Sequence, residues 1–372
     1  MKRSYLLVLA VMLSLHAAES RSGESGTGAS HAVESESEIF TMDRIYRSMF
    51  GPADTDRVTL LQTDEPEVLW ITAVRSDIVG ADGETPESAE YFCHSVLARH
   101  GKPQPDRLRQ LQQLGLSVQN RKMFTLVQGL NEIRFPQGFG IPVFSNDQFD
   151  IVAMVMNPSE PEEPVRVGID SRIEYVRASE LDREIKPLFL VPLVLMVPLE
   201  GADADHSTHQ HGGDETCLAA DSASPTARSV EGSVPISHVS TTHSGHWYVP
   251  PGRHTYRYRL APLRNRINFD TKVHYIASHL HPFGESLELI DLTTGESVFK
   301  ATAHNFPNRV AVEKITHYSS GEGLTIDRSH EHELVAVYNN TTDQDVDSMA
   351  VMYLYLRDSF GSEQATRSLG AR

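Results

Sequence analysis

Residues 149–176 read Phe149-Asp-Ile-Val-Ala-Met-Val-Met156, then Asn-Pro-Ser-Glu-Pro-Glu-Glu-Pro, then Val165-Arg-Val-Gly-Ile-Asp-Ser-Arg-Ile-Glu-Tyr-Val176. Short runs rich in β-branched and aromatic residues, separated by turn-forming residues, are typical of β-strands. Similar runs occur at residues 67–74, 124–127, 188–191, 194–197, 287–290, 333–338 and 350–356. We therefore expect an all-β fold of two jelly-roll-like β-sandwich domains in tandem. One helix is expected to interrupt the strands, at residues 106–114.

The length of 372 residues supports two domains, because one hydrophobic core rarely serves a chain of this size. We expect an N-terminal sandwich at 56–185, a C-terminal sandwich at 186–358 and a tail at 359–372. A polar, His-rich insert at 201–238 is long for a loop without secondary structure, which indicates function or disorder. Residues 19–55 are predicted to be a flexible leader, since their Ser/Gly/Glu-rich first part offers little apolar surface to bury.

The first 18 residues have the pattern of a secretory signal peptide. Met1-Lys-Arg is followed by the apolar run Tyr5–Leu15 and then by small residues at Ala17-Ala18. We expect a secreted protein, either extracellular or periplasmic. The apolar run is too short to span a bilayer, and no later segment is long enough, so no membrane span is expected.

The charge balance and the missing motifs exclude several classes of function. The chain has 33 Lys and Arg against 50 Asp and Glu, a net charge of −17, which argues against a nucleic-acid partner. It contains no phosphate loop, no Gly-x-Ser-x-Gly elbow and no His-Glu-x-x-His helix, the signatures of three common hydrolase classes. With only Cys93 and Cys217, the fold does not depend on a disulfide framework; the two cysteines form one bridge or bind metal.

The most informative stretch for function is Val273-His-Tyr-Ile-Ala-Ser-His-Leu-His-Pro-Phe-Gly284. Residues i and i+2 of a strand point to the same face, so His279 and His281 can share one metal ion. Imidazole suits copper or zinc, and a thioether as third ligand, for which Met349 is the candidate, would favour Cu(I). The alternative is a pair of ordinary surface histidines, because the chain has 18 histidines.

This phrase, followed by Tyr338-Asn-Asn-Thr341 and Ser348-Met-Ala-Val-Met-Tyr353, resembles the C-terminal domain of the copper type II ascorbate-dependent monooxygenases, the family of peptidylglycine α-hydroxylating and dopamine β-monooxygenases. The resemblance implies that Met349 binds the copper at which oxygen is activated and that Tyr353 lines the substrate pocket. Aligning Val273-His274 with the family's pair places the ligands at His281 and Phe283. A shift along the strand gives His279 and His281 instead, with His274 as a possible accessory ligand.

The family holds a second copper in its first domain with a His-His pair and a later histidine. The matching positions here are Cys93-His94 and Met156, a set that could form a soft Cu(I) site. Core packing is the alternative for Cys93 and Met156. In the polar insert, His209, His211 and Cys217 could form a further metal site, or they could simply be solvated.

The resemblance implies a copper-dependent monooxygenase that uses dioxygen and a reductant such as ascorbate to hydroxylate an activated C–H bond of a small molecule or peptide. One copper per chain is expected, or two if the altered first-domain set also binds. That alteration favours an alternative, a non-catalytic secreted copper-binding double sandwich for storage or delivery. A third possibility is a metal-free interaction module.

Overall fold

The computed structural model describes residues 29–48, 50–83, 85, 88–101, 121–198, 243–267 and 269–359. The secondary structure of these residues consists of β-strands and three short 3₁₀ turns, Ala89–Tyr91, Ala178–Glu180 and Leu263–Asn265. Within the described ranges, no helix is long and apolar enough to cross a membrane. The expected helix at 106–114, the signal segment and the polar insert lie outside the described residues.

The N-terminal half forms a sandwich of two antiparallel layers. Its strands are β1 (His31–Glu36), β2 (Phe40–Met42), β3 (Ala53–Thr59), β4 (Val68–Gly80), β5 (Phe92–Arg99), β6 (Lys122–Val127), β7 (Glu132–Arg134), β8 (Phe139–Phe144), β9 (Gln148–Val155) and β10 (Val165–Arg177). One layer has the order β1-β10-β4-β8 and the other β3-β9-β5-β6. The runs at 165–167 and 173–176 belong to one continuous strand, β10, in which Val167, Ile169, Ser171, Ile173 and Tyr175 are buried at every second position.

The C-terminal half forms the second sandwich. Its strands are β11 (Lys186–Val194), β12 (Val197–Pro198), β13 (His243–Ser244), β14 (His246–Val249), β15 (Gly252–Arg259), β16 (Lys272–Leu280), β17 (Gly284–Asp291), β18 (Glu296–Asn305), β19 (Val312–Ile315), β20 (Tyr318–Thr325), β21 (His332–Asn340) and β22 (Val346–Arg357). One layer is β11-β22-β16-β20 and the other β15-β21-β17-β18-β19. The predicted all-β fold of two jelly-roll-like sandwiches is confirmed.

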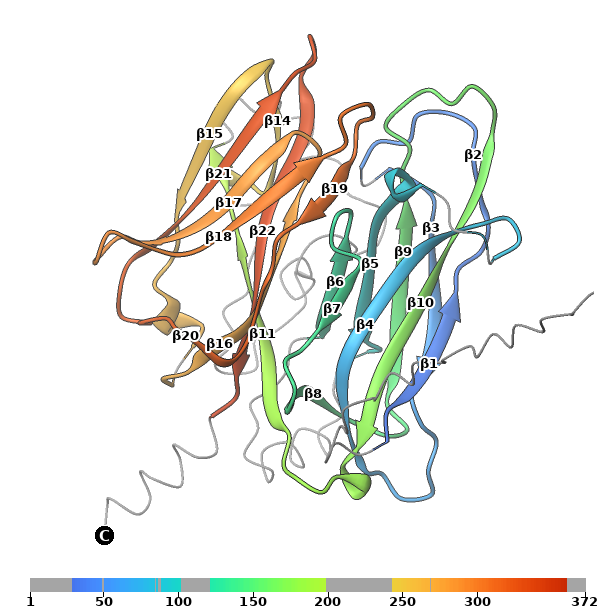
Figure 1. Cartoon of the computed structure of the whole chain (residues 1–372), viewed down its shortest axis with the longest axis vertical. Helices are drawn as coiled ribbons and strands as arrows, with labels where there is room; N and C mark the ends of the chain where they lie inside the picture. The colour runs from blue at the N-terminus through green and yellow to red at the C-terminus, as the bar shows by residue number, and fades with distance from the viewer. Residues whose placement is uncertain are drawn as a thin grey trace, which may run out of the picture.

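The layer β11-β22-β16-β20 is a wall shared by both halves. In Figure 1 the blue-to-green and yellow-to-red strands form two lobes, with β11 and β22 along their boundary. The odd-numbered residues 349–355 of β22 belong to the core of the N-terminal half, and the even-numbered residues 350–356 belong to the C-terminal core. Strand β11 also pairs in parallel with β8, so the sheet is continuous between the halves. The domain boundary at 185/186 stays a prediction.

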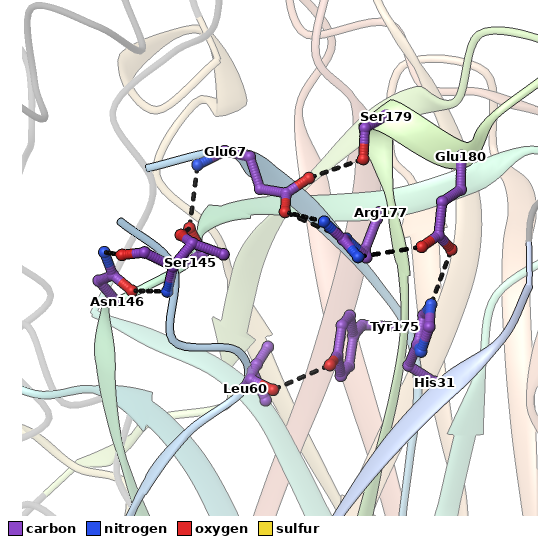
Figure 2. A network of polar contacts seen from close by, with 10 residues as sticks. His31, Leu60, Glu67, Ser145, Asn146, Tyr175, Arg177, Ser179 and Glu180 are labelled. Carbon is purple, nitrogen blue, oxygen red and sulfur yellow. Dashed lines mark hydrogen bonds and ion pairs between the residues drawn. The ribbon is translucent and has the colours of Figure 1, made fainter. Parts of the chain in front are cut away.

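The predicted flexible leader needs correction, because residues 31–36 and 40–42 form β1 and β2. Strand β1 is an edge strand and pairs with β10 from His31 opposite Tyr175 to Glu36 opposite Asp170. Figure 2 shows its first residue anchored by side chains: the Nε2 atom of His31 lies 2.7 Å from a carboxylate oxygen of Glu180. Composition missed this strand because its main-chain hydrogen bonds to β10 need no apolar residues.

Figure 2 also shows the salt-bridge network that extends from this anchor. Arg177 donates hydrogen bonds both to Glu180, at 3.2 Å, and to Glu67 at the base of β4, at 2.6 Å. The Tyr175 hydroxyl donates a buried hydrogen bond of 2.9 Å to the Leu60 carbonyl. This end of the N-terminal sandwich is therefore held by polar contacts between strands distant in sequence.

Candidate metal centre

The His-x-His pair lies at the end of β16, on the face turned toward the N-terminal sandwich. Strand β16 pairs with β22 as far as Leu280 opposite Ala350, with His279 opposite Val351, and His281 follows directly after the strand. Leu280 and Ala350 belong to the C-terminal core, whereas Met349 belongs to the N-terminal core. The rings of His279 and His281 lie edge to face, with centroids 5.0 Å apart. The three predicted ligands therefore share one face of the sheet.

A tight turn fixes His281 where β16 ends. Phe283 has a φ of 69°, a conformation that is rare for a residue with a side chain. Its amide donates to the Asn305 side chain at 3.0 Å, and the Gly284 amide donates to the His281 carbonyl at 3.1 Å. A β-carbon on Gly284 would come within 3.0 Å of the Leu280 side chain, so this position suits glycine. Such over-determined, strained turns are common next to functional side chains.

Asp347 and His246 complete the surroundings of His281. A carboxylate oxygen of Asp347 lies 3.2 Å from Nδ1 of His281, and the other lies 3.9 Å from Nδ1 of His246. Strand β14 pairs with β22 and places His246 opposite Met349. The ring centroids of His246 and His281 are 5.9 Å apart.

These contacts shift the acidities of the paired groups. Burial disfavours the carboxylate of Asp347, but its contacts with His246 and His281 outweigh burial and hold its pKa well below the usual range. Burial likewise opposes protonation of His281, but Asp347 outweighs that effect and raises the pKa of the imidazole. Electrostatics therefore favour an ionised Asp347 carboxylate beside a protonated His281 imidazole.

On the N-terminal side, Cys93, Met154 and Met156 form a small buried cluster of sulfur-containing side chains. Strand β5 bulges between Phe92 and His94, and His94 is paired with Met154 of β9. Nδ1 of His94 lies 3.2 Å from the sulfur of Cys93. The structure thus brings together the predicted set Cys93, His94 and Met156, and it adds Met154.

Ser48 joins the two halves of the centre. Its hydroxyl oxygen lies 3.3 Å from Nε2 of His281 and 3.9 Å from the sulfur of Cys93. The two sets of candidate ligands therefore meet across the interface between the sandwiches. Hydroxyl, imidazole and carboxylate follow one another here as in serine hydrolases, and Ser48 is half-buried.

His279 is the most unusual residue of the centre. It is 5% exposed, and neither of its ring nitrogens has a hydrogen-bond partner among the described atoms. Burial, and then the charges of His281, His94 and His246, hold its pKa well below the ordinary value. A buried neutral imidazole without partners is costly, and a bound metal ion would satisfy its lone pair.

The donor set fits a soft metal ion better than a hard one. Among the described residues, no three His, Cys, Asp or Glu side chains are grouped to hold a metal ion. The predicted set of His279, His281 and Met349 contains only two such residues, since its third donor is a thioether. Imidazole together with sulfur is the combination that selects Cu(I).

The remaining predicted site residues lie elsewhere or outside the described chain. His274 is at the far end of β16, where its ring stacks on Phe139 at 4.1 Å and its Nδ1 lies 2.9 Å from the Ser320 carbonyl. Tyr353 is 1% exposed and packs in the N-terminal core, on the same face of β22 as Met349. The accessory candidates of the insert, His209, His211 and Cys217, are outside the described residues.

Four residues of the centre did not emerge from the sequence: His246, Asp347, Ser48 and Met154. Asp347 could have been found, because it stands two residues before Met349 and so shares its strand face. His246 and Ser48 reach the centre only through strand pairing and the packing of the two halves, which no local pattern encodes.

No protein-family model matches the chain, and no curated protein does. Among solved structures, similarity is found to PNGF-II, with 9% identity over 88% of this chain and 65% of that chain and a TM-score of 0.32. It is also found to the major capsid protein P2 of bacteriophage PM2, with 7% identity over 88% of this chain and 98% of that chain and a TM-score of 0.30. The chain therefore spans about two thirds of PNGF-II and nearly all of the capsid protein.

Proposed function

We propose that this protein binds copper, with His279, His281 and Met349 as ligands. The observation that carries the proposal is the buried His279 ring, whose two nitrogens lack hydrogen-bond partners among the described atoms, on the strand face that also presents His281 and Met349. The resemblance of these residues to the copper site of the ascorbate-dependent monooxygenases supports the same assignment.

The surrounding residues hold these side chains in place. The Asp347 carboxylate lies 3.2 Å from Nδ1 of His281, and a proton held on Nδ1 would leave Nε2 as the metal-binding atom. The buried Tyr338 hydroxyl donates a 2.6 Å hydrogen bond to the Met349 carbonyl and so fixes the backbone of the third ligand. When bound, copper would supply one-electron redox chemistry.

Binding without turnover, as in storage or delivery, is the function that the geometry supports best. The residues His279, His281, Met349 and Tyr353 are at most 5% exposed. A substrate that is to be oxidised would have to reach a copper ion buried among them, which disfavours turnover. The joining of both ligand sets through Ser48 also differs from the two separate copper centres that the monooxygenase mechanism requires.

Copper-dependent hydroxylation is the second candidate, favoured by the His279-x-His281 pair together with Met349, which lies on the same face of β22 as Tyr353. It would use dioxygen and a reductant such as ascorbate on a small molecule or peptide. Ascorbate-dependent oxygen consumption by the copper-loaded protein, above that of an equal amount of free copper in the presence of the His281→Ala variant, would establish turnover. A rate equal to this background would leave binding as the function.

The binding proposal is tested by metal analysis of purified protein after loading with Cu(I) and removal of excess copper. His279→Ala and His281→Ala should each lose most of the copper that the wild type retains. His274→Ala is the matched control, since this histidine is on the same strand but outside the centre, and it should keep wild-type copper. Wild-type copper content in both ligand variants would overturn the assignment.

A further inference from the structure

We propose that a pocket at the opposite end of β16 from the metal centre binds a small organic phosphate, recognised by Lys186, Lys272 and Arg357. The pocket has a volume of about 310 Å³, which is within the usual range for small-molecule sites. It lies where the first residues of β11 and β16 and the last residue of β22 come together. The pocket shares no residue with the proposed copper site, so this inference goes beyond the proposed function.

The three cations have no carboxylate partners. Within the described part of the chain none of them forms an ion pair, and the Nζ atom of Lys272 donates to the Glu322 backbone carbonyl at 3.2 Å. Two carboxylates also line the pocket, but Asp270 is paired with Arg328 at 2.9 Å, which leaves only Glu322 to offset three positive charges. Positive charge therefore prevails locally in a chain whose net charge is −17.

Contacts between the strands hold the cations at the pocket. The Nζ atom of Lys186 lies 5.2 Å from the centroid of the Phe139 ring, a cation–π contact with β8. The amide of Asp358 donates to the Pro187 carbonyl at 2.8 Å, which fixes the end of β22, and with it Arg357, beside the start of β11. Side chains that are already positioned lose less conformational freedom when a ligand binds.

A buried histidine, His274, forms part of the pocket wall. It is 3% exposed, and its Nδ1 lies 2.9 Å from the Ser320 carbonyl oxygen. Strand β16 is irregular at this point, between Val273 and Tyr275, and bulges of this kind redirect side chains next to functional sites. Gly323, with a φ of 75°, lets β20 pass close to the ring, because a β-carbon there would come within 2.7 Å of it. The backbone of two strands is thus shaped around a residue that lines the pocket.

The cations act on this histidine together. Burial lowers the pKa of His274, the contact with the Ser320 carbonyl opposes that effect, and the charges of Lys186, Arg357 and Lys272 lower the pKa further. The three cations are therefore close to one buried ring and to one another. A bound anion would offset their mutual repulsion.

One guanidinium and two ammonium groups suit a phosphate monoester. A guanidinium donates two parallel hydrogen bonds to phosphate oxygens, whereas an ammonium acts as a compact point charge. A phosphate monoester concentrates nearly two negative charges and three acceptor oxygens on one group. A dicarboxylate carries the same charge on two separated groups, so three converging cations favour the phosphate.

The test is calorimetric titration of the full chain with glycerol phosphate, succinate and glycerol at low ionic strength. Glycerol phosphate should bind at one molecule per chain, more tightly than succinate, and glycerol should not bind. Arg357→Gln should weaken the phosphate by about tenfold or more, because charge-assisted hydrogen bonds are lost. Arg253→Gln is the matched control, since this exposed arginine lies outside the pocket, and it should bind like the wild type.

Lys186→Gln repeats the test from the neighbouring strand, with the exposed Lys300→Gln as its control, and should also weaken the phosphate. Absence of phosphate binding, tighter binding of succinate, or equal affinity in the pocket variants and their controls would overturn the proposal. Copper loading separates this site from the proposed function. His281→Ala should lose copper and keep its phosphate affinity, whereas Arg357→Gln should keep copper.

Discussion

At the scale of single residues, Met349 is the ligand candidate whose contribution a conservative change isolates most cleanly. Met349→Leu keeps the buried volume, and such swaps cost less than about 1.5 kcal/mol of unfolding free energy. Loss of the thioether should nevertheless lower Cu(I) affinity about tenfold relative to Cu(II), because sulfur favours the reduced ion. Met352→Leu is the control, since Met352 is equally buried on the opposite face of β22. Equal Cu(I) affinities in both variants would make Met349 a core residue only.

Asp347 is a positioning residue, because it contacts His281 and His246 but supplies no predicted metal ligand. Asp347→Asn keeps the shape and removes the charge, and loss of such a partner lowers metal affinity roughly 10- to 100-fold. Chelator competition should show this loss. Asp345→Asn, an exposed neighbour, should bind copper like the wild type. Full affinity in Asp347→Asn would show that His281 needs no carboxylate to orient it.

At the scale of strands and turns, the junction of β17 and β21 should give a pH-dependent contribution to stability. Nδ1 of His330 lies 2.6 Å from a carboxylate oxygen of Asp291, with Asp327 3.4 Å from Nε2. The bond to Asp291 raises the pKa of His330. Burial opposes ionisation of Asp291, but its hydrogen bonds outweigh this and lower its pKa to about 2.

The pH dependence of stability follows from the pKa shifts of His330 and Asp291. The raised pKa of His330 stabilises the fold below pH 6.5, the ordinary value, and this contribution disappears as pH rises through the raised value. The lowered pKa of Asp291 stabilises the fold above pH 3.8, and this contribution disappears as pH falls through about 2. His330→Gln should therefore lower the urea midpoint more at pH 5.5 than at pH 9. An equal decrease at both values would exclude the charged pair as its cause.

Sequence patterns predicted the strands that contain runs of apolar residues. They did not predict strands whose formation depends on pairing with a partner strand. Strand β22 was visible from residues 350–356 because its two faces enter two separate cores. Strand β1 was missed because an edge strand can form through backbone hydrogen bonds to β10 with few apolar residues. At the centre, the His-x-His pair and Met349 were predictable from strand periodicity, whereas His246 depends on the pairing of β14 with β22.

At the scale of the whole molecule, copper should stabilise both sandwiches together. The N-terminal core includes Tyr275, Tyr353 and Tyr355 from the C-terminal half, and the buried Tyr355 hydroxyl donates to the Met123 carbonyl at 3.1 Å. We expect one unfolding transition in urea, shifted upward by Cu(I). A free Cu(I) concentration of 100 times Kd would raise the free energy of unfolding by about 2.7 kcal/mol. His281→Ala should abolish the shift. Two separate transitions, only one of them copper-dependent, would show that the sandwiches unfold independently.

No pattern in the sequence could have predicted that the two halves meet at their ligand sets. Cys93 and His281 both contact the Ser48 hydroxyl, which is a property of the assembled chain. Sequence reasoning assigned these residues to separate copper sites because each set was interpreted within its own domain. The shared wall β11-β22-β16-β20 explains why they converge.

Copper bound among His279, His281 and Met349 should be visible by anomalous X-ray diffraction at the copper absorption edge, from crystals of the Cu(I)-loaded full chain. We expect one strong anomalous peak per chain, beside His281 at the interface of the sandwiches. A peak only at other histidines, or no peak in crystals of protein shown to contain copper in solution, would contradict it.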